Sequence, residues 1–272
     1  MSAVAERTVT VRLGPPQASI MEAHERFVDV EGAFRSAKTW TCLMKVRRKL
    51  EDEPGIAGFI ARWKDQDLHN KLIPDYRKVC ALMGVSHGTW NARESCYDFP
   101  NGSRLYAISL KSSEKTNEQS KVRGMTVAFG YIDQLEEVPF EVYEEAALRL
   151  SQPGYPNQQL LVSPNPVSKT HWIAKEFPET NDKPNHRYIS LSIWDNAHNL
   201  LPETIEAAEA RFPIGHVARP TKLDGRRGVV VRGIPVYTKA FDRGRHVGEV
   251  RMNPSLPLIE AYDFGFHHPA VV

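Results

Sequence analysis

The feature that most constrains this chain is the segment at residues 32–39, which reads Gly-Ala-Phe-Arg-Ser-Ala-Lys-Thr. A short apolar segment at residues 27–30 precedes it, and apolar residues recur at roughly helical spacing from about residue 36 to residue 50. A loop between a strand and a helix can turn its backbone N–H groups toward a bound phosphate, and the helix N-terminus adds a positive field. The pattern therefore predicts a phosphate-binding loop.

This loop matches the G-x-x-x-x-G-K-[ST] pattern with one departure, Ala37 in place of the second glycine. In this pattern Lys38 reaches the β- and γ-phosphates, and the Thr39 hydroxyl ligates Mg²⁺. We expect Ala37 to cost little, because a position where a helix begins should already be close to helical geometry. The alternative interpretation is a chance match in an ordinary turn. The predicted ATP-binding residues of the loop are Gly32, Ala33, Phe34, Arg35, Ser36, Ala37, Lys38 and Thr39.

A second candidate position follows the apolar run at residues 127–132, which ends in Asp133. A continuous apolar run is typical of a parallel strand covered by helices on both faces, and the carboxyl end of such a strand faces the ligand. We therefore interpret Asp133 as the acid on the Mg²⁺ side, with a helix N-cap as the alternative role. The group that orients the attacking water stays open among Gln134, Glu136 and Glu137.

Two arginines are candidates for stabilising charge on the transferring phosphoryl group. Arg35 lies inside the loop, and Arg123 precedes the strand at residues 127–132, from where it could act across a subunit contact. The alternative for Arg123 is an ordinary surface charge. Clusters of basic residues, such as Arg226, Arg227 and Arg232, predict solvated faces or, alternatively, contacts with nucleic-acid phosphates.

Strand patterns alternate with helix patterns along the chain. Strands are expected at residues 159–163 and 188–193, a helix begins at Pro202, and Asn101-Gly102 predicts the tight turn of a hairpin at 95–108. This alternation predicts an α/β fold with a mostly parallel central sheet flanked by helices, as in RecA-like (ASCE) phosphate-loop ATPases. After about residue 215 the composition shifts to Gly, Arg and Pro with short β-like runs, which indicates a boundary and a small C-terminal linker subdomain.

Composition narrows the function classes. The three cysteines lack C-x-x-C spacing, which makes a zinc site or a disulfide framework an unfavoured interpretation and fits a reducing compartment. No basic-then-apolar signal segment opens the chain, and no apolar run approaches the roughly 18 residues of a membrane span. We therefore expect a soluble intracellular protein without a membrane partner.

Taken in order, these motifs resemble the ATPase region of large terminase subunits, the DNA-packaging motors of tailed bacteriophages. Gln17 precedes the loop by about 15 residues, where that family has an adenine-contacting glutamine. The hairpin and Arg123-Gly124 also match. Ser163-Pro164-Asn165-Pro166 resembles the motif that couples hydrolysis to DNA movement, which makes Ser163 and Asn165 candidate coupling residues. Near the C-terminus, Ala261-Tyr262-Asp263-Phe264-Gly265 resembles the first strand of a ribonuclease-H-like nuclease, with Asp263 as its first metal-ligating acid.

The resemblance implies an ATPase that uses ATP and Mg²⁺ to translocate double-stranded DNA into a procapsid in the host cell cytoplasm. Implied partners are non-specifically bound DNA, further copies in a ring, the portal and the small terminase subunit. The implied divisions are a flexible arm at 1–15, the ATPase domain at 16–215, a linker subdomain at 216–258 and a nuclease strand at 259–272.

Three expectations stay open beside this interpretation. The chain ends nine residues after Asp263, so we expect a truncated fragment that lacks the further carboxylates needed for DNA cleavage. Gln134, at the position where many such enzymes have glutamate, favours a nucleotide- and DNA-binding module with little hydrolysis. A helicase or repair ATPase on the same core is the third possibility.

Overall fold

The structure is a computed structural model that describes residues 12–111, 122, 124–228, 248, 262–263 and 270–271. The chain divides into two compact units, Met1–Val230 and Val231–Val272. In the second unit, the described strands β9 (Tyr262–Asp263) and β10 (Ala270–Val271) pair in antiparallel orientation. The predicted limits of the arm, ATPase domain, linker and nuclease strand stay predictions.

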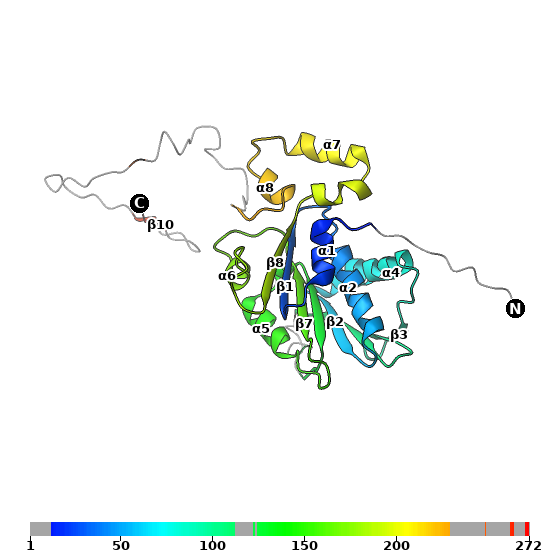
Figure 1. Cartoon of the computed structure of the whole chain (residues 1–272). Helices are drawn as coiled ribbons and strands as arrows, with labels where there is room; N and C mark the ends of the chain where they lie inside the picture. Colours follow the sequence, from blue (N-terminus) through cyan, green and yellow to red (C-terminus); the bar gives the residue numbers. More distant parts are fainter. Residues whose placement is uncertain are drawn as a thin grey trace. The chain divides into compact units, whose positions relative to one another are not determined.

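The first unit is built on an eight-stranded sheet in the described part of the chain, with the order β3-β4-β5-β2-β6-β7-β1-β8 (Figure 1). All pairs from β5 to β8 along this order are parallel, and only the hairpin strands β3 and β4 run antiparallel to their neighbours. The predicted α/β fold with a mostly parallel sheet is therefore confirmed. The strands are β1 (Phe27–Gly32), β2 (Ala57–Arg62), β3 (Thr89–Asn91), β4 (Cys96–Asp98), β5 (Arg104–Ser109), β6 (Phe129–Asp133), β7 (Gln159–Ser163) and β8 (His186–Leu191).

Two groups of helices cover the two faces of this sheet (Figure 1). Apolar side chains of α1 (Pro15–Glu22), α2 (Lys38–Asp52) and α4 (Ile73–Leu82) fill the core on one face, and those of α5 (Phe140–Leu148) and α6 (Trp172–Glu176) fill it on the other. The remaining helical segments of the described chain are α3 (Asp65–Asp67), η1 (Leu68–Leu72), η2 (Leu135–Glu137), η3 (Trp194–Asn199), α7 (Pro202–Arg211) and α8 (Arg219–Lys222).

Strand β1 carries apolar and acidic side chains in alternation. Successive residues of a strand point to opposite faces, so Val28 and Val30 join the core beside α2, while Asp29 and Glu31 point to the other face. Both carboxylates are fully buried, and Arg227 lies against them. The prediction that Arg227 belongs to a solvated or DNA-contacting face is therefore wrong. Its charge is needed inside the unit, where a buried carboxylate must be paired.

The carboxyl ends of the parallel strands meet at one edge of the sheet. β1 ends at Gly32, β6 at Asp133 and β7 at Ser163, and these three strands are direct neighbours in the order β6-β7-β1. Residues that lie 30 or more positions apart in the sequence are thus brought to one edge. This is the edge at which ligands bind in open parallel sheets.

Candidate nucleotide-binding site

The loop between β1 and α2 contains two residues with left-handed backbone geometry, Arg35 (φ 59°) and Ala37 (φ 65°). Ala37 is the N-cap of α2, with ψ 14°. The expectation that position 37 is already close to right-handed helical geometry is therefore wrong. The chain enters α2 through a left-handed turn, a conformation in which glycine is free of the strain that a Cβ atom causes.

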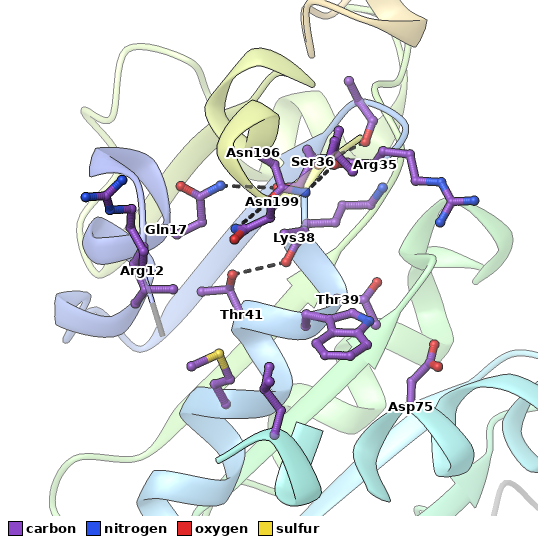
Figure 2. Close-up of a pocket in the computed structure, with 17 residues that line it drawn as sticks. Arg12, Gln17, Arg35, Ser36, Lys38, Thr39, Thr41, Asp75, Asn196 and Asn199 are labelled. Carbon is purple, nitrogen blue, oxygen red and sulfur yellow. Dashed lines mark hydrogen bonds between the residues drawn. The ribbon is translucent and has the colours of Figure 1, made fainter. Parts of the chain in front are cut away.

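A cavity of about 510 Å³ extends along this loop and the first turns of α2 (Figure 2). Gln17, from α1, lines the cavity, and its Nε2 donates to Ser36 O at 3.3 Å and to Asp195 O at 3.1 Å. The Oε1 atom of Gln17 is buried and has no hydrogen-bond partner among the described residues. An acceptor therefore remains available at the position predicted to contact adenine.

The 3-10 segment η3 contacts the loop between β1 and α2 through a side-chain hydrogen bond. Asn196 Nδ2 donates to Arg35 O at 2.8 Å, and Asn199 Nδ2 donates to Asn196 Oδ1 at 2.9 Å. Figure 2 shows Gln17, Asn196 and Asn199 close together beside the loop. Because the amide of Asn196 fixes the carbonyl of Arg35, this contact supports the left-handed conformation there. The loop is thus anchored by a segment that lies more than 150 residues further along the chain.

Asp133 lies beside Thr39. The Thr39 hydroxyl donates to Asp133 Oδ1 at 3.0 Å, and the same oxygen accepts from the Tyr131 hydroxyl at 3.0 Å and from Ser163 Oγ at 2.9 Å. The N-cap of η2 is Gln134, and no side chain caps it, so the structure places Asp133 toward the loop instead of at a helix cap. A hydroxyl and a carboxylate at this separation fit Mg²⁺, which is usually held by one or two protein oxygens plus substrate phosphates.

A chain of hydrogen bonds joins the predicted phosphate-binding lysine to an acid. Lys38 Nζ donates to Gly32 O at 3.0 Å and to Asn165 Oδ1 at 2.9 Å. Asn165 in turn donates from Nδ2 to Glu136 Oε1 at 2.5 Å and from its backbone N to Glu136 Oε2 at 3.1 Å. Burial lowers the pKa of Lys38, and burial raises the pKa of Glu136. Asn165 therefore bridges two groups whose charged forms are both disfavoured by burial.

The three open candidates for orienting water now differ in their surroundings. Glu136 is joined to Lys38 through Asn165. Gln134 has left-handed geometry (φ 56°), and its Oε1 accepts a hydrogen bond from Arg62. Glu137 is half-buried, and its Oε2 has no hydrogen-bond partner in the part of the chain that the structure describes. Among the described contacts, Glu136 is the one of these three candidates that a single residue, Asn165, joins to Lys38.

Arg62, at the end of β2, is a site residue that the sequence analysis missed. Its Nε lies 3.0 Å from Asp133 Oδ2, and Arg62 is only 4% exposed. The sequence carries only a weak signal for it: the short apolar stretch of β2 ends in a charged residue, as that of β6 ends in Asp133. Arg62 therefore forms an ion pair with Asp133, the acid that is predicted to face Mg²⁺.

The other predicted site residues lie in different surroundings. Arg35 lines the cavity, but it is exposed, and its guanidinium lies 5.1 Å from the centroid of the Phe34 ring. Arg123 lies outside the described residues. Asp263 falls within β9, but its side chain is outside the described part. Among the described residues, no cluster of three or more His, Cys, Asp or Glu side chains that could hold a metal ion is present.

The mostly parallel sheet, with helices on both of its faces, has the RecA-like α/β fold that phosphate-loop ATPases share. No protein-family model matches the sequence, and no curated protein matches it. None of the helices in the described part of the chain has the length and apolar character that crossing a membrane requires.

Among solved structures, the chain is similar to the large terminase of the thermophilic bacteriophage D6E, with a TM-score of 0.66 and 17% identity over 94% of this chain and 63% of that one. The D6E protein in complex with ATP-gamma-S gives 0.66 and 18%, over 93% and 62%. The ATPase domain of the Thermus phage P74-26 large terminase gives 0.56 and 15%, over 79% and 94%. The predicted resemblance is thus confirmed at the level of the fold, and this chain spans about 63% of the D6E chain.

Proposed function

We propose that this chain is the ATP-hydrolysing motor of viral DNA packaging, which moves double-stranded DNA into a procapsid. The observation that carries the proposal is the hydrogen-bond chain from Lys38 through Asn165 to Glu136, next to the contact between Thr39 and Asp133. In this proposal a phosphate-binding cation, a Mg²⁺-side acid and a further, half-buried acid lie at one edge of the sheet. These are the groups that phosphoryl transfer to water requires.

Each group has a defined task in this proposal. The backbone N–H groups of the loop and Lys38 hold the β- and γ-phosphates. Thr39 and Asp133 hold Mg²⁺, which neutralises charge on the phosphates when it is bound. Glu136 orients the attacking water, and Asn165 keeps Glu136 in place. Arg35, and Arg123 from a neighbouring copy, stabilise charge on the transferred phosphoryl group.

The proposed partners follow from the resemblance to large terminases. DNA is held without sequence preference through its phosphates, so its binding weakens steeply with salt. Further copies of the chain form a ring, which the portal and a small terminase subunit join in the host cell cytoplasm. The fold similarity to the D6E and P74-26 proteins supports these partners.

A second candidate function is a nucleotide- and DNA-binding module with little hydrolysis. Gln134 favours it, because a glutamine replaces the adjacent acid and its side chain accepts a hydrogen bond from Arg62. Single-turnover ATP hydrolysis, with and without DNA, separates the two functions. A rate that rises with protein concentration supports an arginine supplied by a neighbouring copy.

The Lys38→Ala variant tests the proposal directly. We expect it to lose ATP hydrolysis, because the phosphates lose the cation that the loop places against them. Arg48→Ala is the matched control, since Arg48 lies on the same helix with 65% of its side chain exposed. Basal hydrolysis by Arg48→Ala should equal that of the wild type. Normal turnover by Lys38→Ala would falsify the assignment of the loop.

A further inference from the structure

A buried cluster of three charged side chains lies on the face of β1 that looks away from α2. Arg227 Nη2 is 2.9 Å from Asp29 Oδ2, and Arg227 Nε is 2.7 Å from Glu31 Oε2. Arg227 Nη1 also donates to Phe177 O at 2.6 Å, and the guanidinium lies 4.2 Å from the centroid of the Tyr188 ring. We call Asp29, Glu31 and Arg227 the Arg227 cluster. Every side chain of this cluster is at most 1% exposed.

The segment at residues 164–167 connects this cluster to the candidate hydrolytic groups. Val167 N donates to Glu31 Oε1 at 3.1 Å, at one end of the segment. Two residues earlier, Asn165 donates to both carboxylate oxygens of Glu136. Glu31 therefore binds Arg227 with one oxygen and, with the other, the backbone N–H of Val167, two residues after Asn165.

A second contact ties the same backbone to the residue that follows Arg227. Gly228 N donates to Val167 O at 3.3 Å. Both polar groups of the Val167 backbone are thus held, one by Glu31 and one by the chain at position 228. The orientation of Glu31 itself depends on Arg227, because the guanidinium occupies its other oxygen at 2.7 Å.

We propose that Arg227 is a positioning residue for ATP hydrolysis. It fixes Glu31, Glu31 fixes the N–H group of Val167, and the 164–167 segment thereby keeps Asn165 between Lys38 and Glu136. The inference rests on the proposed function of the site and assigns to it a residue from the far end of the unit. Arg227 touches neither the loop nor the predicted position of the nucleotide.

Buried ion clusters are not in general required for stability. Buried ion clusters can often be replaced by uncharged side chains of similar volume without loss of stability, whereas removal of a single partner leaves an unpaired buried charge. Burial raises the pKa of Glu31 to about 7, and Arg227 opposes that shift. A test must therefore neutralise all three residues together, so that folding is preserved while the contact with Val167 is changed.

Two triple variants meet this condition. Both carry Asp29→Asn and Arg227→Met. The first adds Glu31→Gln, which keeps an oxygen acceptor near Val167 N, and the second adds Glu31→Leu, which removes the acceptor. We expect the leucine triple to bind ATP within about twofold of the wild type, and its kcat to fall by about 10- to 100-fold, the cost of a misplaced group. The glutamine triple should have a kcat between those of the leucine triple and the wild type, because it keeps the acceptor for Val167 N but lacks the guanidinium that orients this acceptor.

Arg227→Lys is a third variant that keeps the charge, so its folding does not depend on neutralisation. A lysine offers one point charge where arginine offers a fork that reaches both carboxylates. We expect a several-fold lower kcat with unchanged ATP affinity. Wild-type kcat in both Arg227→Lys and the leucine triple would overturn the proposal, as would equal kcat in the two triples.

Amide hydrogen exchange supplies a readout that needs no hydrolysis. Peptides covering residues 164–168 are followed with a non-hydrolysable ATP analogue bound. We expect faster exchange in the leucine triple than in the wild type, and an intermediate rate in the glutamine triple. If the wild type itself does not hydrolyse ATP, the proposed function fails, but the exchange result still decides whether the cluster holds this segment. Equal exchange in all three proteins would contradict the positioning role.

Discussion

Ala37 shows how a single Cβ atom can strain the loop between β1 and α2. With φ 65°, its Cβ atom meets the steric penalty of left-handed geometry, which glycine avoids. After the extra chain entropy of glycine is subtracted, we expect Ala37→Gly to raise the free energy of unfolding by about 0.5 to 1 kcal/mol. Urea denaturation followed by circular dichroism measures the change.

The neighbouring Ala33 provides the matched control for this prediction. It is buried in the same loop, and its φ is not positive, so Ala33→Gly should lower stability by about 0.5–1 kcal/mol. An equal loss in Ala37→Gly and Ala33→Gly would show that the left-handed geometry at position 37 carries no strain.

Substitutions of single residues can also decide whether Glu136 or Glu137 orients the attacking water. Because Glu136 is bound through Asn165 to the loop, we expect Glu136→Gln to lower kcat by about 10²- to 10⁴-fold while ATP affinity is retained. Glu137→Gln, which is isosteric in the same way, should change kcat by less than about threefold. Steady-state hydrolysis and equilibrium binding of an ATP analogue measure the two quantities.

The pH profile sharpens this comparison. Burial raises the pKa of Glu136, so its carboxyl group protonates at a higher pH than an exposed glutamate. The wild-type kcat should therefore fall at mildly acidic pH, and Glu136→Gln should lack that limb. If Glu137→Gln lost activity and Glu136→Gln kept it, the assignment would pass to Glu137.

At the scale of elements, β2 and β6 fit together through two glycines. Gly58 is paired in register with Phe129, and Phe59 is paired with Gly130. A Cβ atom at Gly130 would lie 2.3 Å from the Phe59 ring. Because the buried ring cannot move freely, we expect Gly130→Ala to cost about 1–3 kcal/mol of stability. Chemical denaturation measures this cost.

A double variant tests the cause of that cost. Phe59→Leu vacates part of the space above Gly130, so the alanine should cost less in the Phe59→Leu background than in the wild type. This coupling energy is read from a double-mutant cycle. An unchanged cost would mean that some contact other than the Phe59 ring opposes the alanine.

Much of this architecture could be predicted from the sequence, because the residues of each element show a local periodicity or turn signal. The strand, loop and helix around residues 32–39, the buried strand ending in Asp133 and the hairpin at Gly102 all carry strong periodicity or turn signals. β2 was missed because its six residues include a glycine and two alanines, so its apolar pattern is weak. Arg62 was missed with it.

Other site residues have no local signal at all. Asn196 lies in a 3-10 segment, and its role depends only on where the chain folds back against Arg35. The same holds for Arg227, which local composition assigns to a basic surface and which the tertiary fold buries between two acids of β1. The charge of a buried arginine can be read from the sequence, but its partners 196 and 198 residues away cannot.

On the scale of the whole molecule, the first strand of the unit and its last described segment are joined at the Arg227 cluster. Asp29 and Glu31 lie directly before the loop between β1 and α2, and Arg227 lies three residues before the end of the first unit in the sequence. Burial raises the pKa of Asp29, and the nearby charges of Glu31 and Glu136 raise it further. Burial likewise raises the pKa of Tyr188, and the charges of Glu31 and Asp29 act in the same direction. The protonation of this cluster should therefore influence the stability of the whole unit.

The sign of that influence follows from the direction of the shift. Burial raises the pKa of Glu31 from 4.5 to about 7, and burial also raises the pKa of Asp29. Between pH 4.5 and about pH 7 the folded protein binds more protons than the unfolded chain, so stability from this pair is present at low pH and is lost as pH rises toward 7.

The pKa of Glu176 is lowered, so its titration changes stability in the opposite direction, and the measurement requires a reference protein. The triple variant with Asp29→Asn, Glu31→Gln and Arg227→Met removes the titration of the pair together with the charge of Arg227, and it keeps Glu176. We expect the unfolding free energy of the wild type, measured against this variant, to decrease from about pH 4.5 to about pH 7, and a constant or rising difference would show that the pair stays ionised in the folded state.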